Sequence, residues 1–188
     1  MSSLKKLVHN SPVHERKIDI HTYPLEDDRV IVEGWLRDER TTAGQTRDGR
    51  PRPPGVVHLM CVRLLLGGKP LTVLDAEAEM PTTPNPLCPT VADTVKKIIG
   101  LPILAGFSDQ VRKKLYGVEG CSHLMHLILA MAPAGLHGYW AAQNRKPGPA
   151  PRSFEEIPHK EYLINSCRLW REGGPLIRNL KEHFPRNK

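Results

Sequence analysis

The sequence predicts an α+β fold, in which an antiparallel sheet of two β-hairpins is followed by a helical C-terminal half. Apolar and polar residues alternate along residues 14–80, and a turn interrupts each of two such stretches. Apolar residues then recur at helical spacing along residues 90–145. Strands that come first and helices that come later are typical of the α+β class. Because 188 residues suffice for one full hydrophobic core, we predict a single domain over residues 1–188.

The first hairpin is predicted to follow a loose arm of residues 1–13. A strand over residues 16–23 leads into a turn at residues 24–28 and a returning strand over residues 30–38. One face of the returning strand carries Val30, Val32, Gly34 and Leu36, and the other carries Ile31, Glu33, Trp35 and Arg37. This alternation is the period of a half-buried strand.

The second hairpin is predicted from strands over residues 57–66 and 71–80 around a turn at residues 67–70. Its first strand is a dense apolar run, whereas its second has acidic residues at alternate positions, which indicates one solvent-facing side. A loop rich in glycine and proline, residues 39–55, connects the two hairpins. Loops of this kind often border a functional site.

Three helices are predicted in the helical part of the chain. Their expected bounds are Thr90–Ile99, Phe107–Tyr116 and Ser122–Gln143. Ser108 is the expected N-cap of the second helix, because its hydroxyl can accept a hydrogen bond from a free backbone N–H. Pro133 is expected to kink or break the third helix, because proline removes a backbone donor.

The last segment, residues 146–188, is predicted to be a linker and a C-terminal helical segment. Proline recurs along Lys146–Arg152, which is typical of an extended linker. Residues 175–184 follow two glycines and have the pattern of an amphipathic helix.

The formal net charge of +7 raises the question of nucleic-acid binding. Most of the basic excess lies in residues 37–52 and 141–188, without a basic stripe interleaved with aromatic residues. We therefore expect a small-molecule substrate as the partner rather than a nucleic acid.

No apolar stretch approaches the roughly 20 residues of a membrane span, and the N-terminus lacks a signal peptide's apolar run. A cytoplasmic protein without membrane contact is expected, and a homo-oligomer is left open.

The run Gly120-Cys121-Ser122-His123-Leu124 places a thiol and an imidazole two residues apart at the start of a predicted helix. The free N–H groups and the dipole of a helix start favour negative charge, so Cys121 is expected to ionise readily. Cys121 and His123 then qualify as a nucleophile and its base, or as metal ligands. The alternative is structural: Ser122 caps the helix, Cys121 packs, and His123 bonds a loop carbonyl. His126 follows one turn later and could share a metal with His123.

His14, Arg16, Asp38 and His58 are candidate site residues at the ends of predicted strands. His58 shares an apolar strand face, so it is either a core histidine or a general base. Arg16 can hold a carboxylate in a two-pronged grip, either that of Asp38 or that of a substrate. The Asp38 pairing is favoured, because a hairpin brings the outer ends of its strands together.

The four cysteines are widely spread and contain no C-x-x-C pair, which favours reduced thiols. Cys61 lies in an apolar strand and is interpreted as a core residue. A Cys₃His metal site is the alternative use of the others, with zinc or iron as the ion. Its ligands would be Cys88, Cys121, His123 and Cys167.

In their order these motifs resemble a bacterial family catalogued only as a domain of unknown function, whose pattern includes Gly-Cys-Thr-His-Leu. Ser122 stands where that family has threonine, and the first turn, residues 27–29, lacks the family's glycine. The resemblance implies that His14, Arg16, Asp38, His58, Cys121 and His123 belong to one site. It also implies a link to bacteria that degrade aromatic compounds. The matching residues are His14-x-Arg16, Gly34-Trp35-Leu36-Arg37-Asp38, His58, Pro86-Leu87-Cys88, Gly100, Gly106-Phe107, Gly120-Cys121-Ser122-His123-Leu124 and Cys167.

These observations predict a small catabolic enzyme that uses acid–base chemistry, with metal assistance left open. A lyase or hydrolase acting on an aromatic or carbonyl-containing acid or aldehyde is favoured, because no redox-cofactor motif occurs. The expected catalytic residues are His58, His123, Cys121 and Asp38, and the expected substrate-binding residues are His14 and Arg16. Two other classes remain as alternatives: a metal- or ligand-binding accessory protein and a basic nucleic-acid-binding protein.

Overall fold

The computed structural model describes residues 3–46, 48–145 and 148–184. The chain forms two compact units, residues 1–143 and residues 144–188. The boundary lies near the predicted linker, whose first two residues, 146–147, fall outside the described residues. The single domain over residues 1–188 stays a prediction.

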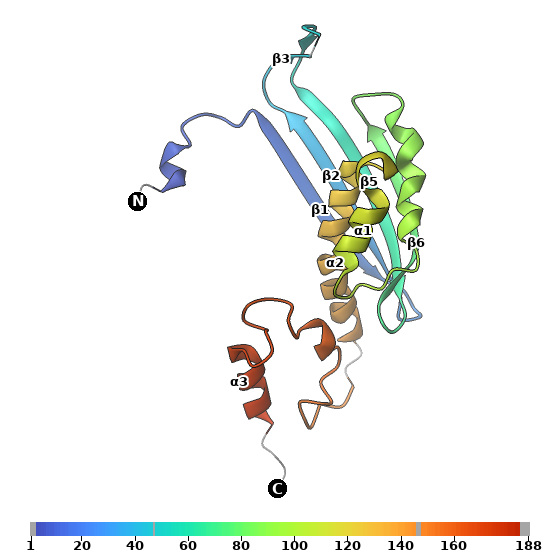
Figure 1. The fold of residues 1–188 in the computed structure, drawn as a ribbon, viewed down its shortest axis with the longest axis vertical. Helices are drawn as coiled ribbons and strands as arrows, with labels where there is room; N and C mark the ends of the chain where they lie inside the picture. Colours follow the sequence, from blue (N-terminus) through green and yellow to red (C-terminus); the bar gives the residue numbers. More distant parts are fainter. Residues whose placement is uncertain (1–2, 47, 146–147, 185–188) are drawn as a thin grey trace. The chain divides into compact units, whose positions relative to one another are not determined.

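The first unit contains the predicted antiparallel sheet, with helices after it in the chain, which confirms the α+β class (Figure 1). The strands lie in the order β1-β2-β5-β6, so the two hairpins join through β2 and β5. Each strand is longer than expected by one to three residues. Their bounds are His14–Pro24 (β1), Val30–Arg40 (β2), Gly55–Gly67 (β5) and Thr72–Thr82 (β6). The connecting loop holds a small second sheet that was not predicted, formed by β3 (Gly44–Gln45) and β4 (Pro51–Arg52).

One face of the four-stranded sheet is buried under helices. Along β2 the even-numbered residues from Val30 to Asp38 are buried and the odd-numbered residues are half-buried, as the sequence pattern predicts. Figure 1 shows the long helix α2 (Ser122–Gln143) across this face, in contact with β1, β2 and β5. Two shorter elements contact each other and α2, namely the 3-10 helix η2 (Cys88–Ile98) and α1 (Phe107–Leu115). The core therefore lies between the sheet and these helices.

Glycines allow α2 and the sheet to approach closely. A Cβ at Gly34 of β2 would lie 2.6 Å from the sulfur of Met131, and a Cβ at Gly135 would lie 2.9 Å from Val32. A Cβ at Gly138 would lie 2.4 Å from the Cβ of Thr22. These contacts fix the helix over the sheet on both sides of Pro133. We attribute to them the fact that α2 runs through Pro133 as one helix, so that, of the predicted kink or break, the break does not occur.

Gly138→Ala is expected to destabilise the first unit. The new methyl group would overlap Thr22, a stiff β-branched residue, so the helix must move away from β1. We expect a net loss of about 1–2 kcal/mol in the free energy of unfolding, after about 1 kcal/mol of gained helix propensity. Gly44→Ala is the control, since nothing lies within 4 Å of its added Cβ. Equal urea midpoints for the two variants would contradict the close packing.

Two local predictions about helix ends need correction. Helix α1 begins at Phe107, and its N-cap is Gly106 in the left-handed region, so Ser108 lies inside the first turn. The predicted helix over residues 90–99 is a 3-10 helix that begins earlier, at Cys88.

In the second unit, α3 (Pro175–His183) matches the predicted amphipathic helix, and η4 (Lys160–Tyr162) is short. Among the described residues no helix is long and apolar enough to cross a membrane.

Candidate functional site

Strand pairing places three of the predicted residues in one row. Arg16 of β1 lies opposite Asp38 of β2, and Asp38 lies opposite His58 of β5. Residues that are directly opposite each other project from the same face of a sheet. The row therefore lies on the face that α2 covers. The register shifts immediately after Asp38, where β5 has the extra residue Val57, and such bulges are common beside active sites.

Asp38 is a buried carboxylate at the centre of the row. Its side chain is 3% exposed. The Arg16 Nε–H donates to Oδ1 at 2.6 Å, and Nη2 donates to Oδ2 at 2.7 Å. This pairing confirms the preference for Asp38 over a substrate as the partner of Arg16. The hydrogen bonds from Arg16 hold the pKa of Asp38 below its ordinary value, although burial acts in the opposite direction.

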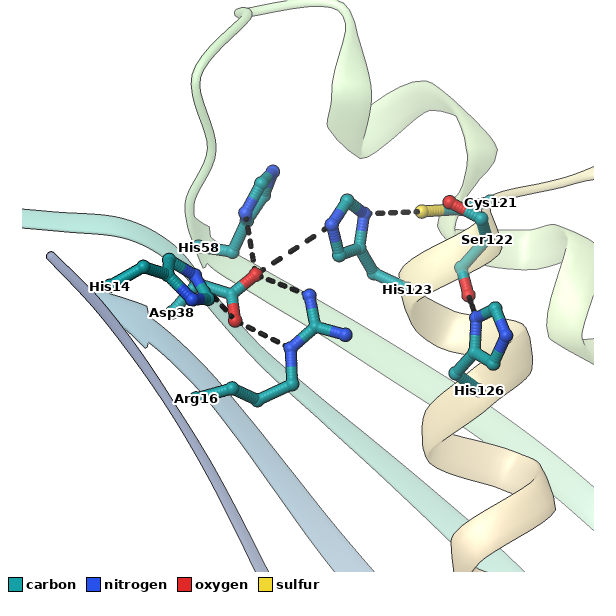
Figure 2. Close-up of polar contacts among 8 residues, drawn as sticks. All are labelled: His14, Arg16, Asp38, His58, Cys121, Ser122, His123 and His126. Carbon is teal, nitrogen blue, oxygen red and sulfur yellow. Dashed lines mark hydrogen bonds and ion pairs between the residues drawn. The ribbon is translucent and has the colours of Figure 1, made fainter. Parts of the chain in front are cut away.

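His58 is oriented by the same carboxylate. Its Nδ1 lies 3.1 Å from Asp38 Oδ2. An ionised carboxylate only accepts hydrogen bonds, so Nδ1 carries the proton and Nε2 keeps a lone pair in the neutral ring. Figure 2 shows the second ring nitrogen turned away from Asp38. His14 approaches Asp38 from the exposed end of β1, with its Nε2 3.5 Å from Oδ1.

His123 reaches the row from the first turn of α2. Its Nε2 lies 3.7 Å from Asp38 Oδ2, and its ring centroid lies 4.0 Å from that of His58. Burial, followed by the charges of His58 and Arg16, lowers the pKa of His123 below its ordinary value. At neutral pH His123 is therefore a neutral ring with one nitrogen free to accept a proton.

Cys121 and His126 lie on either side of His123 in the chain but have different surroundings (Figure 2). The Cys121 sulfur lies 3.8 Å from His123 Nδ1, on the side of the ring away from Asp38. The Cys121 carbonyl accepts the N–H of Met125 at 2.9 Å, so Cys121 occupies the start of α2. His126 Nδ1 instead lies 2.7 Å from the carbonyl oxygen of Ser122 in its own helix.

The structure brings together six predicted residues: His14, Arg16, Asp38, His58, Cys121 and His123. Sequence reasoning did not find the contact between the rings of His58 and His123. No short-range pattern encodes it, because it depends on where α2 crosses the sheet.

One group among the described residues has the spacing of a metal site. Asp38, His58 and His123 each offer a ligand atom, and these atoms lie within 4.8 Å of one another. The two-pronged bond from Arg16 opposes cation binding there, because it places a positive charge against both Asp38 oxygens.

The predicted Cys₃His metal set stays a prediction. His123 belongs to the group just described, and Cys121 contacts it. Cys88 begins η2 of the first unit, whereas Cys167 is an exposed residue of the second unit.

The pH dependence of stability tests the Asp38 pairing. Because its pKa is lowered in the folded state, Asp38 contributes stability above the unfolded value of about 3.8 and loses it as pH falls through the folded value. Asp38→Asn is therefore expected to destabilise the protein at pH 7, and the difference from the unaltered protein should shrink below about pH 4. Asp19→Asn, at an exposed β1 aspartate, is the control. A pH-independent difference measured by urea unfolding would contradict the prediction.

A comparison with family models matches residues 14–136 to the family described as "Protein of unknown function (DUF2889)". A search of the curated proteins and a search of the solved structures each found no match. The matched region begins at His14 and ends within α2. It therefore contains all six clustered residues, whereas Cys167 lies outside it.

Proposed function

The chain belongs to this family of proteins of unknown function, DUF2889, and we propose that it is a small-molecule enzyme that works by acid–base catalysis. One observation carries the proposal. Two partly buried imidazoles, His58 and His123, lie with their ring centroids 4.0 Å apart beside the buried Asp38. A structural histidine needs one hydrogen-bond partner, whereas two adjacent rings beside one carboxylate form a proton-transfer arrangement.

His58 is the proposed general base. Asp38 fixes the tautomer with the proton on Nδ1, which leaves the Nε2 lone pair for a substrate proton. When Nε2 takes that proton, the imidazolium forms next to the buried carboxylate and is stabilised by it. His123 is the proposed second proton carrier, since it is neutral at pH 7 and faces the same carboxylate.

Arginines near the row suit an anionic substrate. Arg16 uses Nε and Nη2 for Asp38, so its Nη1 is available for an anionic or phenolic oxygen. A cavity of about 280 Å³ is lined by Arg40, Arg52 and Val57, the residue before His58. Arg40 lies opposite His14 in the β1–β2 pairing, at the same end of the sheet as Asp38. We propose that the carboxylate of a small organic acid binds here.

The reaction class that these residues fit is lyase or hydrolase chemistry on an aromatic or carbonyl-containing acid or aldehyde. Abstraction of a proton followed by C–C or C–O cleavage needs a base, an acid and a group that binds the anion. We place the enzyme in the cytoplasm, in keeping with its four free cysteines.

A substrate panel tests the proposal. The purified protein is incubated with aromatic acids, aldehydes and esters, and new products are detected by mass spectrometry. We expect at least one product to form, and we expect the double variant His58→Ala/His123→Ala to lose it. Retention of that product by the double variant would refute the assignment of the two histidines. His21→Ala is the control, because His21 is an exposed histidine of β1.

A metal-binding accessory protein is the second candidate, and the spacing of Asp38, His58 and His123 favours it. Elemental mass spectrometry of the untagged protein distinguishes it from the enzyme. Because Arg16 already neutralises Asp38, we expect less than one zinc or iron per chain and no change in thermal stability with a chelator. A stoichiometric metal that is lost in His123→Ala would favour the accessory protein.

A further inference from the structure

We propose that Cys121 is a covalent nucleophile, that His123 is its base, and that the substrate is an activated acyl compound, an ester or thioester. This inference rests on the proposed function and narrows it to a hydrolase with an acyl-enzyme intermediate. The inference rests on three side chains that lie next to one another in the order Cys121, His123 and Asp38 (Figure 2). The two nitrogens of one imidazole face a thiol and a carboxylate, which is the arrangement of a nucleophile, a base and an orienting acid.

The geometry assigns each nitrogen of His123 a separate partner. Nδ1 lies 3.8 Å from the Cys121 sulfur, within hydrogen-bond distance for a sulfur donor. Nε2 lies 3.7 Å from Asp38 Oδ2 and faces the negative charge. The tautomer with its proton on Nε2 is therefore favoured, and Nδ1 is left to accept the thiol proton.

The position of Cys121 at the start of α2 adds electrostatic support. The first helical bond runs from the Met125 N–H to the Cys121 carbonyl. The backbone N–H groups of the three residues between them precede the helical ladder, in the turn that follows Cys121. Such groups stabilise an anion, both a thiolate and the oxyanion of an acyl-transfer intermediate.

The other cysteines lack this environment in the part of the chain that the structure describes. Cys121 is the one cysteine there whose sulfur contacts an imidazole. Cys61 is buried, and burial raises the pKa of its thiol to about 11. Cys167 is exposed and Cys88 is half-buried, so both serve as internal references for a reactivity measurement.

The proposed reaction balances without a redox partner. His123 Nδ1 takes the thiol proton as the Cys121 sulfur bonds to the acyl carbon. The bond from that carbon to the leaving oxygen or sulfur then breaks, and the leaving group takes the proton from His123. Water attacks the resulting thioester, His123 removes its proton, and the Cys121 sulfur leaves with that proton. The products are a carboxylic acid and an alcohol or thiol.

Alkylation of the intact protein by iodoacetamide tests the nucleophile without a known substrate. Peptide mass spectrometry gives the rate at each cysteine. We expect Cys121 to react about tenfold faster than Cys167, although Cys121 is less exposed. His123→Asn should slow Cys121 about tenfold and leave Cys167 unchanged. His126→Asn is the matched control, because His126 bonds its own helix, and it should leave both rates unchanged. Equal rates at Cys121 and Cys167 would overturn the proposal.

The acyl-enzyme is tested with p-nitrophenyl acetate. We expect an initial burst of p-nitrophenol and one acetyl group on Cys121, and we expect Cys121→Ala to lose both. If acetylation is absent while a panel product still depends on His58 and His123, this inference fails and the acid–base function stands. If the panel product is also independent of both histidines, the two proposals fail together.

Discussion

Arg16→Ala is expected to lower the free energy of unfolding by about 3 kcal/mol, because it leaves a buried carboxylate without its cationic partner. Asp38 is 3% exposed, so water cannot replace the two hydrogen bonds that Arg16 donates. His58 remains beside Asp38 Oδ2, but it supplies a single hydrogen bond. Urea unfolding at pH 7 measures the effect.

A double-mutant cycle separates this pair from the packing of the arginine stem. Asp38→Asn removes the charge that Arg16 balances, so Arg16→Ala should cost much less in the Asp38→Asn background. Arg37→Ala is the matched control, since Arg37 is on the half-buried face of β2 and pairs with Glu39. Additive effects of the two substitutions would show that the Asp38–Arg16 pair does not hold the end of the sheet together.

Local patterns predicted the part of the site that lies within the sheet. The alternation along residues 30–37 separated the two faces of the returning strand, and the hairpin turn brought Arg16 and Asp38 together at the outer ends of its strands. Both inferences need only a period of two and a turn position. His58 was identified as a candidate because it occurs on an apolar strand, and its pairing with Asp38 follows from the β2–β5 register.

The rest of the site depends on tertiary packing that the sequence does not display. His123 meets His58 only because α2 packs closely on the sheet, with Met131 against Gly34 of β2 and Gly138 against Thr22 of β1. No rule of spacing links a residue of α2 to a residue of β5 that precedes it by more than sixty positions. Of the kink or break expected at Pro133, the break does not occur for the same reason, because contacts with the sheet on both sides outweigh the local preference of proline. Intrinsic propensity is a weak guide where a helix is packed along its length.

His58→Ala is expected to lower kcat/KM about 10²- to 10⁴-fold for a panel substrate whose proton His58 removes as general base. The reason is that no neighbouring group can replace its Nε2 with the same orientation. His123 presents its own Nε2 toward Asp38, and His14 is at the exposed end of β1. Steady-state kinetics on the first substrate found would measure the loss.

Stability measurements make this result interpretable. His58 donates a single hydrogen bond to Asp38, and Arg16 keeps Asp38 paired in the variant, so we expect His58→Ala to cost only about 1 kcal/mol. A large loss of kcat/KM with a small loss of stability would separate a catalytic histidine from a structural one. The reverse pattern, a strongly destabilised protein that keeps its kcat/KM, would mean that the row of Arg16, Asp38 and His58 exists to hold three strands together. Catalysis would then rest on Cys121 and His123, without His58 as a general base.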